Sequence, residues 1–198
     1  MDILDKRLYE FLAVEQSTIP KSSISDMKQN YTESLSKVMR IKTAFFHRRT
    51  ARSYEAAESI GLLKMMRSDS FVRFAEAITG YQLNPEWEIQ VSCYGQGDYV
   101  GPHNDHHPES ETHKKGFIDV HLMFINDAVA HQYLVYEQRG HFSRLVDINK
   151  QGAVSVYELP FWHYTTPLVG KKRREGEARR WLLLGTFSIL DQSRSGKT

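Results

Sequence analysis

The chain has 198 residues with 40% hydrophobic and 25% charged side chains, a formal net charge of +2 and one cysteine, Cys93. This composition is ordinary for one globular domain, the small charge argues against electrostatic binding of nucleic acid or membranes, and a lone cysteine excludes an intrachain disulfide. Because no apolar stretch reaches the length of a membrane span and the first residues lack a signal-peptide pattern, we expect a cytoplasmic protein.

The first 80 residues have the hydrophobic spacing of helices. Apolar side chains recur three and four residues apart, which places them on one helical face. The predicted helices cover residues 2–17, 23–40, 53–66 and 68–80. The last of these has a capping serine at Ser68 or Ser70 and a terminating glycine at Gly80.

After Gly80 the sequence changes to short segments rich in β-branched and aromatic residues, which is typical of strands. These segments cover residues 87–95, 116–127, 131–138, 143–149, 152–159 and 179–190. Helices followed by strands predict a helical layer packed on an antiparallel sheet or barrel. We therefore expect one α+β domain over residues 1–190, mainly helical over 1–80 and a β-core over 85–190, with a flexible tail at 191–198.

Residues 99–109, YVGPHNDHHPE, concentrate titratable side chains in one short segment. His103 and Asp105 lie two positions apart, so on an extended chain both can point to the same side and reach one ion. His163, at the edge of a later predicted strand, is the expected third ligand. Two histidines and one carboxylate on one side of an ion form the facial arrangement of non-haem Fe(II) sites that activate O2. The two histidines after Asp105 are interpreted as exposed loop residues.

An arginine opens the last predicted strand. Arg180 is followed by Trp181 and Leu182, and an unpaired guanidinium in such apolar surroundings would be costly. We therefore expect it to bind an anion, and its planar fork suits a carboxylate. Arg179, or a basic residue within 171–174, is the alternative for this role.

These motifs, in this order, resemble the 2-oxoglutarate- and Fe(II)-dependent oxygenases, and specifically their prolyl-hydroxylase-like branch. The resemblance extends over about residues 65–190 and rests on the segments CYGQGDYVGPHND, GFIDVHLMFIN, FWHYTTPLVG and RRWLLLGTF. It implies a double-stranded β-helix, or cupin-like jelly roll, buttressed by the N-terminal helices.

The resemblance also implies the site. Fe(II) would be held by His103, Asp105 and His163. The distal carboxylate of 2-oxoglutarate would be gripped by Arg180, and Tyr94 would donate a hydrogen bond to the same cosubstrate.

One tyrosine of the family pattern is replaced here. Relatives carry a tyrosine on the second strand of the core, at the position interpreted as Phe124, which cannot donate a hydrogen bond to 2-oxoglutarate. Thr165, Thr186 or water is the candidate substitute. If Phe124 faces the interior of the barrel, His121 faces outward, so His121 is not assigned to the site.

The activity that the resemblance implies is that of a dioxygenase hydroxylating an unactivated C–H bond, coupled to decarboxylation of 2-oxoglutarate to succinate and CO2. Its cofactors would be Fe(II), 2-oxoglutarate and O2, with ascorbate as a candidate reductant. Asp105 favours hydroxylation, because halogenating relatives lack this carboxylate. The compact chain favours a free amino acid or small metabolite as substrate, without a nucleic-acid or membrane partner. The alternatives are a prolyl hydroxylase acting on protein, a non-catalytic jelly-roll protein that binds a metal or ligand, and a cupin-type isomerase or lyase.

Overall fold

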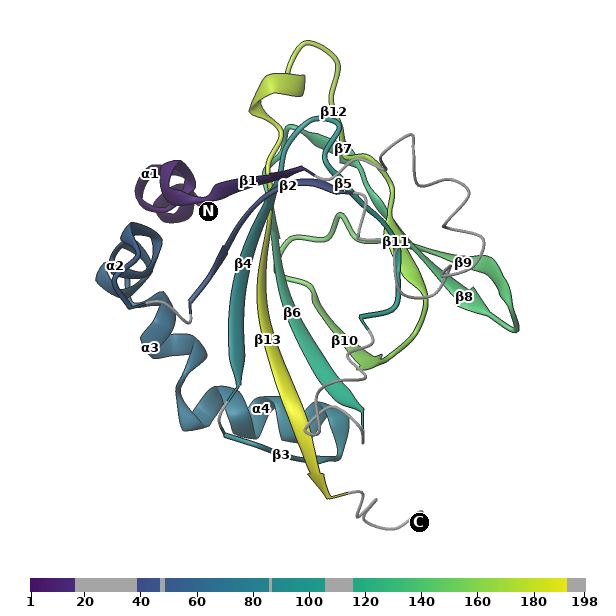
Figure 1. The fold of residues 1–198 in the computed structure, drawn as a ribbon. Coiled ribbons are helices and arrows are strands. Elements are labelled where there is room, and N and C mark those ends of the chain that lie inside the picture. Colours follow the sequence, from purple (N-terminus) through teal and green to yellow (C-terminus); the bar gives the residue numbers. More distant parts are fainter. Residues whose placement is uncertain (17–38, 47–48, 86, 106–115, 192–198) are drawn as a thin grey trace, which may run out of the picture.

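A strongly curled antiparallel sheet forms the centre of the computed structural model, which describes residues 1–16, 39–46, 49–85, 87–105 and 116–191 (Figure 1). The strands are β1 (Ala13–Gln16), β2 (Met39–Phe45), β3 (Gln82–Leu83), β4 (Glu88–Tyr94), β5 (Tyr99–His103), β6 (Phe117–Ile125), β7 (Val129–His131), β8 (Tyr133–Gln138), β9 (His141–Asp147), β10 (Val154–Leu159), β11 (His163–Thr165), β12 (Val169–Gly170) and β13 (Arg180–Asp191). In this part of the chain the main sheet has the order β10-β6-β13-β4-β2-β5-β11-β8-β9, with β1 beside β2 and β3 beside β13, while β7 and β12 pair separately. The predicted double-stranded β-helix core is confirmed.

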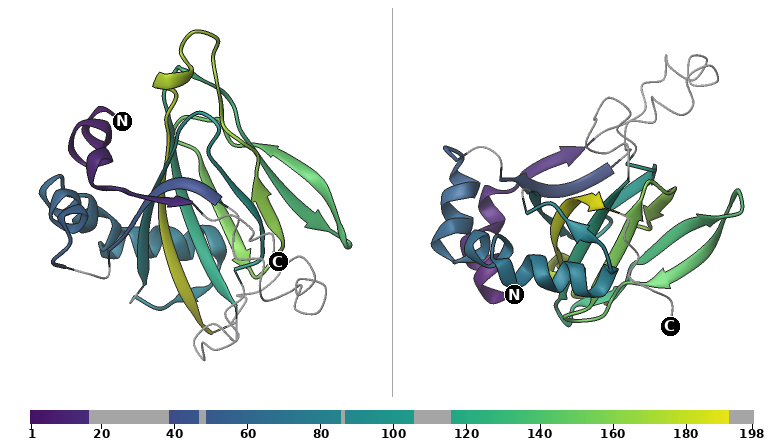
Figure 2. Two further views of the ribbon diagram at one scale, coloured as in Figure 1. Left: turned by 45° about the horizontal axis from the view of Figure 1, so that its top comes forward. Right: turned by 90° about the horizontal axis from the view of Figure 1, so that it is seen from below.

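Helices cover the outer face of this sheet (Figure 2). They are α1 (Asp2–Arg7), α2 (Arg52–Ser59), α3 (Leu62–Met66) and α4 (Asp69–Thr79), with short 3-10 turns at Tyr9–Phe11 and Glu175–Glu177. Among the described helices, none combines the length and the apolar character needed to cross a bilayer.

The two faces of the sheet have different partners, because side chains alternate along each strand. On β6, Ile118 and Val120 belong to the core cluster beneath the helices, whereas Phe117 and Met123 belong to a second cluster on the inner face. The long strand β13 alternates in the same way. The inner face of the curled sheet is therefore where side chains can surround a ligand.

The predicted strand segments and the helix at 68–80 are confirmed, but the helix predicted at 2–17 is too long. Its residues 13–16 form the strand β1, which pairs with β2. The helix predicted at 53–66 is interrupted by Gly61, whose φ of 75° lies in the left-handed region. Of the helix predicted at 23–40, residues 23–38 lie outside the described residues, and 39–40 belong to β2 rather than to a helix.

The contribution of the N-cap of α4 to stability can be tested. Ser68 accepts a hydrogen bond from the backbone N–H of Phe71 at 3.2 Å, as an N-cap does. We expect Ser68→Ala to lower the free energy of unfolding by about 1 kcal/mol, measured by urea denaturation. The control is Ser70→Ala, an exposed position in the same turn that should change little; equal losses in both variants would contradict the assignment of the cap.

Candidate metal centre and its pocket

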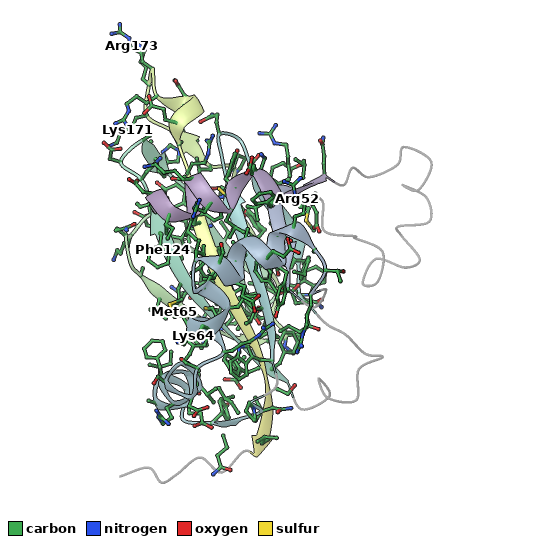
Figure 3. The ribbon with its side chains drawn as sticks, turned by 90° about the vertical axis from the view of Figure 1, so that its left-hand side faces the viewer. Arg52, Lys64, Met65, Phe124, Lys171 and Arg173 are labelled. Carbon is green, nitrogen blue, oxygen red and sulfur yellow. The ribbon has the colours of Figure 1, made fainter. Side chains whose placement is uncertain are left out.

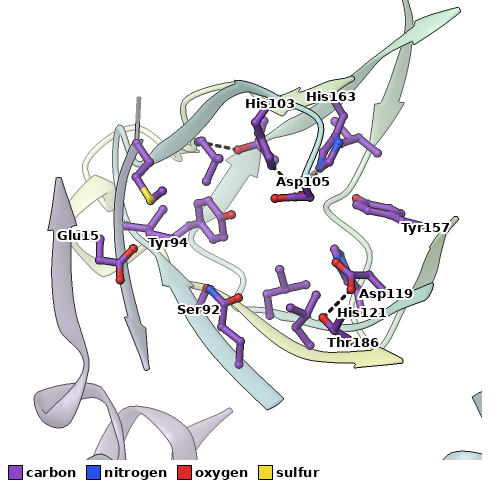
Figure 4. A pocket seen from close by; sticks show the side chains of 18 of the residues that line it. Glu15, Ser92, Tyr94, His103, Asp105, Asp119, His121, Tyr157, His163 and Thr186 are labelled. Carbon is purple, nitrogen blue, oxygen red and sulfur yellow. Dashed lines mark hydrogen bonds and ion pairs between the residues drawn. The ribbon is translucent and has the colours of Figure 1, made fainter. Parts of the chain in front are cut away.

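Three side chains converge at the end of β5 and the beginning of β11 (Figure 4). His103 and His163 are direct partners in the antiparallel register of these two strands. The Oδ2 atom of Asp105 lies 3.3 Å from Nε2 of His103 and 3.6 Å from Nε2 of His163. The candidate ligand atoms of all three residues lie within 4.8 Å of one another. The structure thus brings together the three residues that the sequence predicted as a metal site.

Backbone hydrogen bonds orient both imidazole rings. Nδ1 of His103 lies 2.7 Å from the carbonyl oxygen of Gly101, and Nδ1 of His163 lies 2.9 Å from that of Phe161. A carbonyl oxygen only accepts, so each Nδ1 carries the proton and each Nε2 keeps its lone pair. Burial, and then the nearby His103, lowers the pKa of His163 to about 3. A neutral imidazole is the form that binds a metal.

Asp105 reaches the histidines through a turn rather than along an extended strand. β5 ends at His103, and Asp105 has a φ of 53°, in the left-handed region. Aspartate tolerates this conformation better than most residues. The sequence analysis assumed that residues two positions apart on an extended strand point to the same side. It therefore predicted the correct pair of residues, although the chain turns at Asp105 and is not extended there. His106 and His107 lie outside the described residues.

The triad opens into a cavity of about 340 Å³ on the inner face of the sheet. Its walls combine apolar side chains with polar and charged ones. The polar and ionisable lining residues include Glu15, Glu88, Tyr94, His103, Asp105, Asp119, His121, Tyr157, His163, Thr165, Arg180 and Thr186.

Arg180 is a buried cation in this cavity. It is 1% exposed and forms no ion pair with a carboxylate among the described residues. Nη1 donates to Oε1 of Gln132 at 3.2 Å, and Nη2 lies 3.3 Å from the sulfur of Met123, while Nε has no hydrogen-bond partner there. Burial lowers the pKa of Arg180, although arginine still remains protonated near neutral pH. A buried guanidinium without an anion is costly, which points to an anionic ligand.

The alternative basic residues point elsewhere. The guanidinium of Arg179 donates to the carbonyl oxygens of Gly176 and Ala178 and lies over the ring of Tyr9. Within 171–174, Arg174 pairs with two surface carboxylates, and Lys171 and Arg173 extend from the hairpin tip (Figure 3). Among the described basic residues considered for the role, Arg180 is the one that lines the cavity.

Tyr94 lies beside Arg180 in the cavity. The guanidinium lies 5.0 Å from the centre of the Tyr94 ring, and both residues line the cavity together with Thr165. Burial raises the pKa of Tyr94, so its hydroxyl stays a donor. Thr165, one of the predicted substitutes for the missing tyrosine, lines the cavity. The hydroxyl of Thr186, the other candidate residue, donates to Asp119 at the far end of the cavity.

The prediction of which β6 side chains face the cavity is wrong, because the inward-facing positions are shifted by one residue. Phe124 packs in the cluster beneath the helices, on the outer side of the sheet (Figure 3), and does not line the cavity. His121 is 6% exposed and does line it. Asp119 shares this face, as alternation along the strand requires. The missed signal was the sequence FIDVHLM itself, in which two polar residues alternate with apolar ones inside an otherwise buried strand.

Comparisons with known proteins give a fold for this arrangement. No protein-family model and no curated protein matches the sequence. An oxidoreductase of the 2OG-Fe(II) oxygenase family from Burkholderia pseudomallei is 12% identical, with a TM-score of 0.53 over 94% of this chain and 89% of that one. A prolyl-4-hydroxylase from Pseudomonas putida is 15% identical, with a TM-score of 0.46 over 96% and 97%. The likeness to the Burkholderia protein shows a 2OG oxygenase-like fold, as the sequence resemblance predicted.

Proposed function

We propose that this chain is a 2-oxoglutarate- and Fe(II)-dependent dioxygenase that hydroxylates an unactivated C–H bond of a small molecule. The observation that supports this most strongly is that one cavity contains both the His103–Asp105–His163 triad and Arg180, a buried cation without an anionic partner among the described residues. A metal-binding protein without turnover has no need of a carboxylate clamp next to the metal.

The residues present fit the two groups. Two Nε2 atoms and one carboxylate offer three ligands on one side of an ion, a donor set suited to Fe(II) with open positions for ligands. The uncompensated guanidinium suits the distal carboxylate of 2-oxoglutarate, with Tyr94 beside it and Thr165 in the same cavity. When bound, iron and 2-oxoglutarate would supply the oxidising power from O2, with succinate and CO2 as coproducts and ascorbate as a reductant.

The chain itself would position these groups and exclude water. Arg180 would fix the keto acid through its distal end, so that its other end faces the triad. The ring of Phe161 stacks on His163 with centroids 4.6 Å apart, and the ring of Tyr157 meets His163 edge-on at 5.4 Å. These aromatic rings cover one side of His163. A cavity of about 340 Å³ lies at the small end of the range for ligand pockets, which supports a small metabolite or free amino acid as substrate.

Succinate release tests the proposed function. Aerobic incubation with Fe(II), 2-oxoglutarate, ascorbate and a metabolite mixture should yield succinate and a product heavier by one oxygen atom. His103→Ala should abolish both, because it removes a ligand, whereas His141→Ala, on the exposed strand β9, should retain them. Equal succinate yields from wild type and His103→Ala would contradict the proposal.

A further inference from the structure

The cavity has a second polar end, far from Arg180. The strands β4, β13 and β6 lie side by side, and their register places Tyr94 next to Arg180 in one row. At the other end of the same strands, Glu88, Thr186 and Asp119 form a row across the sheet. The two rows are separated by roughly 20 Å along β13. The cavity floor is therefore cationic at one end and acidic at the other.

Asp119 is the buried carboxylate of this acidic end, which we define as Glu88, Asp119 and His121. It is 7% exposed, and its Oδ1 accepts a 2.6 Å hydrogen bond from the hydroxyl of Thr186 (Figure 4). Its Oδ2 lies 3.7 Å from Nε2 of His121, which is too far for a hydrogen bond. One carboxylate oxygen is thus left without a hydrogen bond from the described residues.

His121 is an independent indication that this end of the cavity binds a ligand. It is 6% exposed, and both of its ring nitrogens lack a hydrogen-bond partner among the described residues. A buried polar group without a hydrogen-bond partner costs free energy. A histidine at this position therefore favours a bound ligand that pairs with its ring nitrogens. The ring packs against Tyr157 with centroids 4.2 Å apart, and Tyr157 in turn contacts His163. A ligand at the acidic end would therefore lie within a few side chains of the metal triad.

The charges of the cavity indicate the kind of ligand. In the proposed enzyme, the positive charges of Fe(II) and Arg180 offset the negative charges of Asp105 and the 2-oxoglutarate dianion. Asp119, Glu88 and Glu15 remain as acidic groups in the same cavity, and none of the three forms an ion pair with a lysine or arginine among the described residues. Glu15 lies on β1, on the other side of the cavity from Asp119 (Figure 4). A substrate that carries positive charge would complete the balance.

We propose that the acidic end binds a positively charged nitrogen of the substrate, which is a small amine. Asp119 accepts a hydrogen bond from the ammonium group through Oδ2, Glu88 adds negative charge at the rim, and His121 bonds to a neighbouring polar group of the same molecule. This inference rests on the proposed function for its assignment of substrate, whereas binding of amines at the acidic end can be measured without turnover.

The experiment is a binding screen of the full chain. A library of small metabolites divided into amines, neutral compounds and carboxylates is screened by thermal shift, under nitrogen with Fe(II) and 2-oxoglutarate and again without them, and the positives are titrated by calorimetry. We expect amines to predominate among the compounds that bind, apart from 2-oxoglutarate-like dicarboxylates. Asp119→Asn should weaken their affinity about tenfold or more. The matched control is Asp69→Asn, an exposed position at the start of α4, which should bind as wild type does.

A second variant separates a binding role from a structural one. His121→Phe keeps an aromatic ring against Tyr157 but removes both unpaired nitrogens. We expect its melting temperature without ligand to equal or exceed that of wild type, while its affinity for the amines falls.

Binding restricted to neutral or anionic compounds, no binding in any class, or amine affinities that Asp119→Asn leaves unchanged would each overturn the inference. If 2-oxoglutarate fails to bind wild type while amines bind through Asp119, the proposed function is wrong but the amine site stands.

Discussion

Replacing Arg180 by methionine should weaken the binding of 2-oxoglutarate by about 2–5 kcal/mol, or roughly 30- to 5,000-fold. The guanidinium is almost fully buried, and its Nε has no hydrogen-bond partner among the described residues. Without it, the distal carboxylate of the ligand would face an apolar side chain at a buried position. The affinity is measured by anaerobic calorimetry in the presence of Mn(II), which avoids turnover.

The same variant separates binding from folding. Methionine fills a similar volume without a charge to desolvate, so the free energy of unfolding of the ligand-free protein should not fall. The neighbouring Arg179→Met is the matched control, because that side chain lies over Tyr9 outside the cavity and its loss should leave 2-oxoglutarate affinity unchanged. If Arg179→Met weakens binding and Arg180→Met does not, the clamp has been assigned to the wrong arginine.

Asp105→Asn should reduce Fe(II) affinity by at least about 100-fold and remove Fe(II)-dependent turnover. Changes in groups that merely orient metal ligands commonly cost 10- to 100-fold, and Asp105 is proposed to contact the metal itself. Asparagine tolerates the left-handed conformation that Asp105 adopts, so the turn and the shape of the site are retained while the negative charge is lost. Affinity is measured by competition with a coloured chelator under nitrogen.

Asp69→Asn again serves as the control, because it makes the same chemical change at an exposed helical position. An Asp105→Asn protein that binds Fe(II) as tightly as wild type would show that this carboxylate is not a ligand.

Much of the β-core could be predicted because its strands are rich in β-branched and aromatic residues and are separated by turn residues. The bounds of the helix α4 could also be predicted, from the capping Ser68, the helical spacing of its apolar residues and the terminating Gly80. The strand β1 was not, because the helical spacing that ends near Leu12 runs directly into it. Its pairing with β2 is a long-range contact that local periodicity does not encode.

The ligand triad could be predicted from residue types and spacing, since strand ends bring distant residues together. The acidic end could not, because it depends on the register of β6. Once Phe124 was placed inside the barrel, strict alternation excluded His121 from the site. An error of one residue in the orientation of the strand assigns every side chain to the wrong face. The packing of Phe124 beneath the helices shows the correct orientation.

The most direct measurement of the central proposal is a crystal structure of the protein soaked anaerobically with Mn(II) and 2-oxoglutarate, using the anomalous signal of the metal. The predicted result is one metal peak at bonding distance from Nε2 of His103, Nε2 of His163 and the carboxylate of Asp105, with the distal carboxylate of 2-oxoglutarate on Arg180. A metal bound elsewhere, or a keto acid that does not touch Arg180, would contradict it.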